Sequence, residues 1–160
     1  MKKLIILYFA TVLFSCNGTA QKKTTETPKT FKVTKTESEW KAELSEMEFY
    51  VLRKAGTERP FTSPLNKNYA EGRYHCAACN TPLFKSKHKF DSGTGWPSFD
   101  REIKDNVAFS TDNHLAYTRT EEHCATCGGH LGHVFNDGPK NTTGKRHCIN
   151  GVSLRFVPKE

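Results

Sequence analysis

Two short stretches, YHCAAC (residues 74–79) and EHCATC (residues 122–127), decide how this sequence is interpreted. Each carries two cysteines with two residues between them, and in each the first cysteine follows a histidine. A Cys-x-x-Cys turn directs both sulfurs towards one centre, and two such turns complete a tetrahedron of thiolates around zinc. The sequence therefore predicts one zinc ion per chain, in a closed structural site whose ligands are Cys76, Cys79, Cys124 and Cys127.

Three other interpretations of these four cysteines stay open. Export from the cytoplasm would favour disulfides. One pair could be a redox couple of the thioredoxin type, although no β-α-β pattern surrounds either pair. All four could also be buried free thiols. Zinc is favoured because a small chain with only 36% hydrophobic residues gains much from a metal that joins its parts.

The 160 residues fit one domain of ordinary size, with an apparent export segment before it. Lys2 and Lys3 precede an apolar run over residues 4–14, and Cys16 follows it in a pattern that resembles a bacterial lipobox. We expect a lipoprotein signal peptide at residues 1–15 and a membrane anchor at an acylated Cys16 in the bacterial cell envelope. Ordinary cleavage after Ala20, giving a periplasmic or secreted soluble protein, and a buried N-terminal helix are the alternatives.

The positive charge lies mostly outside the predicted domain. The whole chain has a net charge of +7, and removal of residues 1–15 takes away two lysines. Residues 17–39 hold five lysines and three glutamates, which leaves only +3 on residues 40–160. Four thiolates and a zinc ion would reduce that further, so the domain has no basic surface typical of nucleic-acid binding.

The Thr-rich residues 16–36 are predicted to be a flexible tether, and residues 37–160 the folded domain. For Phe31 and Val33, a place at the edge of the domain is the alternative. Two Ser/Thr-x-x-Glu capping boxes predict two short helices at the start of the domain, and Gly56 suits the position after the second.

Short β-type runs separated by Gly, Pro, Asn and Asp follow the helices. We expect strands over residues 74–76, 83–84, 107–110, 115–119, 133–135 and 147–156, with a hairpin turn at Asp112–Asn113. The predicted fold class is therefore mainly β, with helices at its front.

If Cys16 is acylated, Cys148 is the one thiol left over, in the stretch RHCIN. Alternate residues of a strand share a face, so Arg146, Cys148 and Asn150 are expected to project together. A guanidinium beside a thiol favours the nucleophilic thiolate, and the amide can donate a hydrogen bond to the same centre. A buried, inert cysteine is the alternative.

Two further clusters are candidate parts of a site. In GGHLGHVFNDG, His130 and His133 can titrate near neutral pH and Asp137 can orient one of them, although either histidine could simply support the scaffold. In FDSGTGWPSFD, Trp96 stands between Gly95 and Pro97 and suits the wall of a pocket, with a place in the core as the alternative.

Taken in order, these stretches resemble the B-type methionine sulfoxide reductases, also called the MsrB or SelR family. The resemblance covers about residues 38–160, including YHCAACNTPLF, KFDSGTGWPSF, CATCGGHLGHVFNDGP and RHCINGVSLRF. It implies a compact antiparallel fold of two sheets with peripheral helices. It also implies thiol-dependent reduction of methionine (R)-S-oxide in peptides and proteins, which repairs oxidative damage.

The resemblance assigns a role to each candidate. It implies that Cys148 is the nucleophile, that the four Cys-x-x-Cys cysteines bind zinc, and that the other site residues are Trp96, His130, His133, Asp137, Arg146 and Asn150. The sequence departs from many members at Thr94, where they carry a resolving cysteine. A sulfenic acid on Cys148 would then be reduced by an external thiol or a thioredoxin-like partner. A zinc-ribbon binding module and a disulfide-linked secreted domain are the rival classes.

Overall fold

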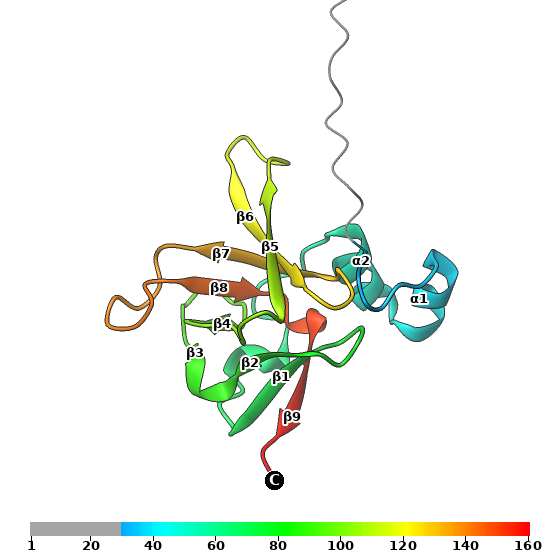
Figure 1. The fold of residues 1–160 in the computed structure, drawn as a ribbon. Coiled ribbons are helices and arrows are strands. Elements are labelled where there is room, and N and C mark those ends of the chain that lie inside the picture. The colour runs from blue at the N-terminus through cyan, green and yellow to red at the C-terminus, as the bar shows by residue number, and fades with distance from the viewer. Residues whose placement is uncertain (1–29) are drawn as a thin grey trace, which may run out of the picture.

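The computed structural model describes residues 30–160 (Figure 1). Helices lie at the start of this part of the chain and strands fill the rest, with single turns of 3-10 helix at η1 Pro64–Lys67, η2 Ser86–His88 and η3 Gly151–Ser153. The signal peptide and the acylated Cys16 expected from the sequence lie outside the described residues. The helices and strands are α1 Glu37–Glu43, α2 Glu46–Lys54, β1 Gly72–Cys76, β2 Pro82–Lys85, β3 Lys89–Phe90, β4 Ser98–Phe99, β5 Val107–Asp112, β6 Arg119–Cys124, β7 His130–Phe135, β8 Arg146–Ile149 and β9 Leu154–Pro158.

The strands form two antiparallel sheets, which confirms the predicted fold class. The smaller sheet has the order β2-β1-β9 and the larger the order β3-β4-β8-β7-β6-β5. The chain passes from the larger to the smaller sheet through η3, between β8 and β9. At Gly151 a Cβ would lie 1.9 Å from Ser63 Oγ, so only glycine allows this close crossing. The single strand predicted over residues 147–156 is therefore two strands in different sheets.

Both predicted helices form, and local side-chain bonds explain where they start. In each capping box, the side-chain oxygen of the first residue accepts a hydrogen bond from the backbone N–H of the glutamate three residues on. The glutamate carboxylate accepts one from the backbone N–H of the first residue (Thr36 with Glu39, Ser45 with Glu48). The end of α2 differs from the expectation. Ala55, not Gly56, adopts the left-handed conformation at φ 53°.

The strand predicted over residues 115–119 is also wrong, because β6 begins only at Arg119. Asp112 ends β5, and its carboxylate accepts a hydrogen bond from the His114 N–H at 2.8 Å, which turns the chain out of the sheet. Residues 113–118 then form the loop of the β5–β6 hairpin, which projects from the rest of the molecule (Figure 1).

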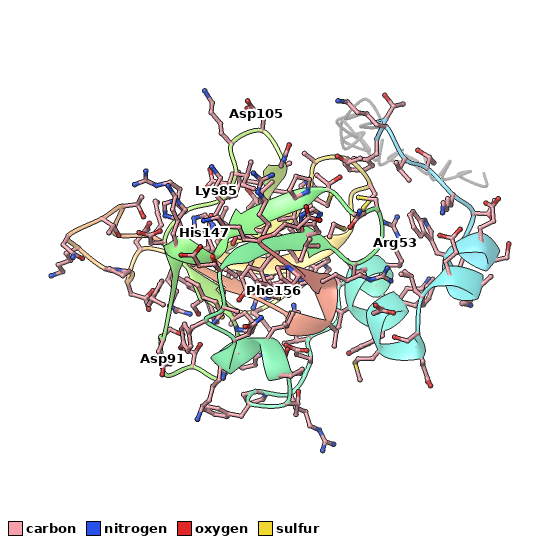
Figure 2. All side chains as sticks on the ribbon, turned by 90° about the horizontal axis from the view of Figure 1, so that it is seen from below. Arg53, Lys85, Asp91, Asp105, His147 and Phe156 are labelled. Carbon is pink, nitrogen blue, oxygen red and sulfur yellow. The ribbon has the colours of Figure 1, made fainter. Side chains whose placement is uncertain are left out.

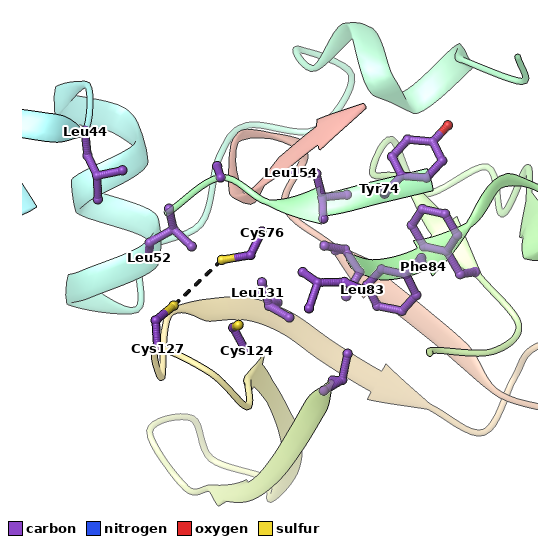
Figure 3. Close-up of a cluster of buried hydrophobic side chains, with 14 of the residues drawn as sticks. Leu44, Leu52, Tyr74, Cys76, Leu83, Phe84, Cys124, Cys127, Leu131 and Leu154 are labelled. Atoms are coloured by element: carbon purple, nitrogen blue, oxygen red, sulfur yellow. Dashed lines mark hydrogen bonds between the residues drawn. The ribbon is translucent and has the colours of Figure 1, made fainter. Parts of the chain in front are cut away.

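The core lies between the two sheets and under α2. Phe84 stacks on Phe99 with ring centroids 4.4 Å apart, and Tyr74 meets Phe99 edge-on at 4.9 Å. Leu52 of α2 points towards the cysteines at the other end of this cluster (Figure 3). Next to it, Arg53 reaches from the helix towards the sheets and donates a hydrogen bond of 2.9 Å to the Cys127 carbonyl (Figure 2).

The residues just before α1 contact the domain. Val33 N–H donates to the Thr126 carbonyl at 3.0 Å, and the Phe31 ring covers Gly128 and meets His123 edge-on. The last part of the segment predicted as a tether thus packs on the second Cys-x-x-Cys turn. Over residues 30–160, no helix has the length and apolar character needed to span a membrane.

Candidate metal site and candidate active site

The four predicted zinc ligands form one cluster. Their sulfur atoms all lie within 4.8 Å of one another, with Cys76 Sγ 3.8 Å from Cys127 Sγ and Cys79 Sγ 3.5 Å from Cys124 Sγ. A sulfur–sulfur distance of about 3.8 Å follows from a tetrahedron with Zn–S bonds of about 2.3 Å. The cysteines are not bonded to one another, so the geometry fits a metal and not the disulfide alternative.

The two Cys-x-x-Cys turns are built alike. Cys76 is the last residue of β1 and Cys124 the last of β6. Each carbonyl accepts a hydrogen bond of 2.8 Å from the residue four positions on, Asn80 and Gly128, and both of these residues have a positive φ. The shared geometry explains why the same spacing occurs twice, since each turn must bring its two sulfurs to the same centre.

Cys148 lies in a separate cavity of about 130 Å³. It is on β8, between β7 and β4, with His133 directly opposite on one side and Ser98 on the other. Directly opposed residues of an antiparallel pair share a face, so His133 and Cys148 face the same space. The cavity thereby brings together four predicted site residues, and its walls are Thr57, Trp96, Arg119, Gly132, His133, Phe135, Cys148 and Asn150.

Two features give the cavity its shape. Trp96 is half-buried and donates from Nε1 to the Glu58 carbonyl at 3.2 Å, which holds the indole against residues 57–58. On the opposite strand, a Cβ at Gly132 would lie only 2.0 Å from the Cys148 carbonyl oxygen. Glycine at this position therefore lets β7 approach the backbone of the cysteine without filling the cavity.

Burial raises the pKa of the Cys148 thiol above its ordinary value, and this effect exceeds the opposing ones. The Arg146 guanidinium and the Thr94 hydroxyl, whose Oγ1 is 3.9 Å from Sγ, act to lower the same pKa. The contact with arginine expected from the sequence is present, but the expected net effect on the pKa is reversed, because the thiol is also buried.

The expectation that Asp137 orients a histidine is wrong. Both Asp137 oxygens accept hydrogen bonds from Arg146, at 2.9 and 2.8 Å. The carboxylate at His133 is Asp112, whose Oδ2 lies 2.7 Å from His133 Nε2. The same oxygen accepts a hydrogen bond of 2.6 Å from Arg119 Nη2, so the β5–β6 hairpin supplies both Asp112 and Arg119 to the site.

The bonds at Asp112 determine the state of His133. Hydrogen bonds from the His114 backbone and from His133 keep the pKa of Asp112 well below its usual range, so this carboxylate is ionised and can only accept. His133 Nε2 therefore donates, and Nδ1 is the acceptor nitrogen of the neutral ring. Burial lowers the pKa of His133, which favours that neutral ring.

His130 and Asn150 have supporting positions. Nδ1 of the buried His130 lies 2.7 Å from Glu121 Oε1. The His130 ring meets the His133 ring edge-on, with centroids 5.5 Å apart. Asn150 lines the cavity, but its amide donates to the Leu131 carbonyl and its oxygen accepts from the Glu58 N–H, both at 3.0 Å. These bonds hold the end of β8 in place.

Part of this site could not be predicted from the sequence. There Asp112 indicates only a turn, and Arg119 only the end of a strand. Their role depends on strand pairing, since β7 must pair with β6 before Asp112 reaches His133. The completely buried Glu122, 2.6 Å from His147 Nδ1 on the other side of the sheet, was also missed.

The SelR domain model matches residues 44–158. The chain belongs to the SelR domain family. Its relatives include proteins named peptide methionine sulfoxide reductase MsrB, which form a family of oxidoreductases. The protein of Chromohalobacter salexigens is 49% identical over 130 residues, which cover 81% of this chain and 98% of that protein. The protein of Methanosarcina mazei is 51% identical over 130 residues, covering 81% and 92%.

A plant relative of this SelR domain is the peptide methionine sulfoxide reductase B1, chloroplastic, of Oryza sativa. It is 50% identical over 122 residues, covering 76% of this chain and 56% of the plant protein. Among solved structures, the Mis18 "Yippee-like" domain matches with a TM-score of 0.43 and 14% identity, over 56% of this chain and 98% of that domain.

Proposed function

We propose that this protein reduces methionine (R)-S-oxide in peptides and proteins to methionine. Family membership and the names of the relatives support activity of the methionine sulfoxide reductase B type. The observation that carries the proposal is the pairing of Cys148 with His133 across β7 and β8, in a cavity whose wall includes Trp96. That arrangement offers a nucleophile, a proton carrier and an apolar surface for the methyl group of the substrate.

In the proposed reaction, His133 accepts the thiol proton at Nδ1 as Cys148 attacks the sulfoxide sulfur. The same proton then passes to the sulfoxide oxygen, which must be protonated before its bond to sulfur breaks. The oxygen then moves from the substrate sulfur to Cys148 as the transient sulfur–sulfur bond breaks, which leaves a sulfenic acid on Cys148 and releases methionine with its sulfur reduced. Arg146 stabilises the developing thiolate, while Asp112 holds the His133 ring in the required tautomer.

Recycling requires a reductant from outside the chain. Thr94, at 3.9 Å from Cys148 Sγ, lies where a resolving cysteine would otherwise form a disulfide. A thiol of a thioredoxin-like partner, or a small thiol, would instead attack the sulfenic acid, which releases water and forms a mixed disulfide with Cys148. A second thiol would then attack that mixed disulfide, which restores the Cys148 thiol and releases the oxidised reductant as a disulfide. We expect dimedone to label Cys148 after a single turnover without reductant; a disulfide between Cys148 and another cysteine of the chain would contradict this route.

We further propose that the cysteine cluster binds zinc. Its sulfur–sulfur distances support this, and the four thiolates leave no position for substrate, so the metal would act on folding alone. The sequence of residues 1–36 supports a second proposal, in which an acylated Cys16 anchors the protein in the bacterial envelope. Mass spectrometry of the mature N-terminus tests it, and an unmodified N-terminus at Gln21 would support ordinary secretion instead.

The reaction itself is tested with the two sulfoxide epimers as separate substrates. We expect the R epimer to be reduced and the S epimer to be left unchanged, because the cavity presents the substrate sulfur to Cys148 from one side. Cys148→Ser should abolish the activity while the fold, followed by circular dichroism, is retained. Full activity of this variant would contradict the assignment and leave a zinc-binding module without catalysis as the better explanation.

A further inference from the structure

The cavity at Cys148 is too small to account for binding of a polypeptide. Its volume of about 130 Å³ is below the roughly 300–1,000 Å³ typical of small-molecule pockets, so it suits a single side chain. If the proposed function holds, the residues on either side of the methionine sulfoxide must contact the protein outside the cavity. The surroundings of the cavity mouth therefore decide which polypeptides bind.

Phe61 is an unusual residue next to this mouth. Its side chain is 67% exposed, and its backbone has φ 64°, a conformation that bulky residues rarely adopt. Most of this ring is exposed to solvent, so its burial offsets little of the cost of the conformation, and such strain is concentrated at functional positions.

The strained conformation joins Phe61 to the loop that forms the cavity. Its N–H donates to the Gly95 carbonyl at 2.8 Å, and its ring lies over the Cα of Gly95, where a Cβ would be 2.9 Å from the ring. The two neighbours of Gly95 are Thr94, which contacts Cys148, and Trp96, which lines the cavity. Phe61 thus extends the wall of the cavity outwards.

A second exposed aromatic residue stands beside another wall. Tyr117, on the loop of the β5–β6 hairpin, is 59% exposed, and its ring centroid is 6.0 Å from the guanidinium of Arg119. Arg119 lines the cavity. Exposed aromatic rings next to a specific pocket are typical of sites that bind polypeptides, because they offer large contact area and lose little side-chain entropy.

We propose that Phe61 and Tyr117 form an outer binding surface for an extended polypeptide, with Phe61 as the main contact. The surface would bind apolar or aromatic residues that flank the methionine sulfoxide, while the cavity holds the sulfoxide side chain itself. The continuity of Phe61 with the cavity wall and its exposure at a strained position support this occupant. Free methionine sulfoxide does not reach the surface.

The test compares two substrates in one variant. Phe61→Asn removes the ring, and Asn tolerates a positive φ, so the backbone is not disturbed further. With an apolar peptide containing methionine (R)-S-oxide, we expect KM to rise about five- to tenfold while kcat changes little. With free methionine (R)-S-oxide, the change in KM should be much smaller than with the peptide. Phe61→Tyr keeps an aromatic ring and should retain the wild-type KM for the peptide. Tyr69→Asn, at an exposed aromatic residue outside the site, should leave the same KM unchanged.

Binding of the same peptide to Cys148→Ser, with and without Phe61→Asn, separates this proposal from the proposed function. Weaker binding in the double variant supports the outer surface even if the wild type reduces neither substrate. Equal binding, or an equal loss of activity towards the peptide and the free sulfoxide, would overturn it. A wild type that reduces neither epimer would overturn the proposed function alone.

Discussion

At Cys148, burial and charge act in opposite directions on one pKa. Burial raises the pKa of the thiol, and Arg146 lowers it from the same face of β8. The guanidinium is itself held by both oxygens of Asp137, which fixes its position and partly neutralises its charge. The resting state is a neutral thiol beside a neutral His133, and the thiol carries the proton that the sulfoxide oxygen needs.

Arg146→Gln should therefore move the pKa of Cys148 further upwards, because the guanidinium that lowers it is removed. At any fixed pH the fraction of thiolate falls, so alkylation by iodoacetamide slows, and the midpoint of its pH profile shifts to higher pH. Peptide mapping identifies modification at Cys148. Lys145→Gln removes a neighbouring charge whose amine bonds to Asn136, and should leave the profile unchanged. An unchanged profile in Arg146→Gln would show that the guanidinium does not act on the thiol.

Asp112→Asn should lower kcat about 10²–10³-fold, with a smaller effect on KM. The amide no longer requires His133 Nε2 to donate, so the ring loses its preferred tautomer, and Arg119 loses a charged partner. Steady-state kinetics with free methionine (R)-S-oxide measure the change. Asp105→Asn is the matched control, because Asp105 is exposed in a loop and Asn accepts its positive φ. Wild-type kcat in Asp112→Asn would exclude this role for the carboxylate.

At the scale of elements, α2 supports the metal site from outside. Its residue Leu52 is buried against Gly129, and Arg53 binds the Cys127 carbonyl. A helix of nine residues is marginal by itself, so this packing provides most of its stability. The helix and the second Cys-x-x-Cys turn therefore depend on each other.

Leu52→Ala should reduce the free energy of unfolding by about 2–5 kcal/mol, because it removes buried methyl groups and leaves a cavity beside the metal site. Met47→Ala lies on the exposed side of the same helix and should change it by less than about 0.5 kcal/mol. Urea denaturation of both variants with zinc present gives the two values. Equal effects would mean that the helix contributes through its own propensity and not through packing.

At the scale of the whole molecule, the cysteine cluster joins the two sheets. Cys76 ends β1 in the three-stranded sheet, and Cys124 ends β6 in the six-stranded sheet. The sulfurs of Cys76, Cys124 and Cys127 lie at the edge of the hydrophobic core, next to the buried Leu131 (Figure 3). A metal there would hold the sheets at one end of the core, while the crossing at η3 connects them through the chain.

Cys127→Ser should abolish zinc binding and much of the stability, since metal binding and folding are coupled in such sites. Cys148→Ser is the matched control: it makes the same substitution but should retain one zinc ion per chain and unfold like the wild type. Metal analysis and thermal unfolding give the two readouts. A zinc-free wild-type protein of full stability would contradict the structural role of the cluster.

The sequence alone determined the features that depend on neighbours a few residues apart. The capping boxes join residues three positions apart, and each Cys-x-x-Cys turn brings together two sulfurs three positions apart. The four clustered cysteines, the two helices and the candidate nucleophile Cys148 could therefore be predicted. The resemblance to a known family added the fold and the activity.

Tertiary structure decided what depends on strand pairing and burial. His133 meets Asp112 only because β6 lies between their strands in register, and Asp137 was left to pair with Arg146. The direction of the Cys148 pKa shift follows from how deeply β8 is covered, which local sequence does not specify. Contacts between residues distant in the chain, and the loss of water around them, arise only when the whole domain has folded.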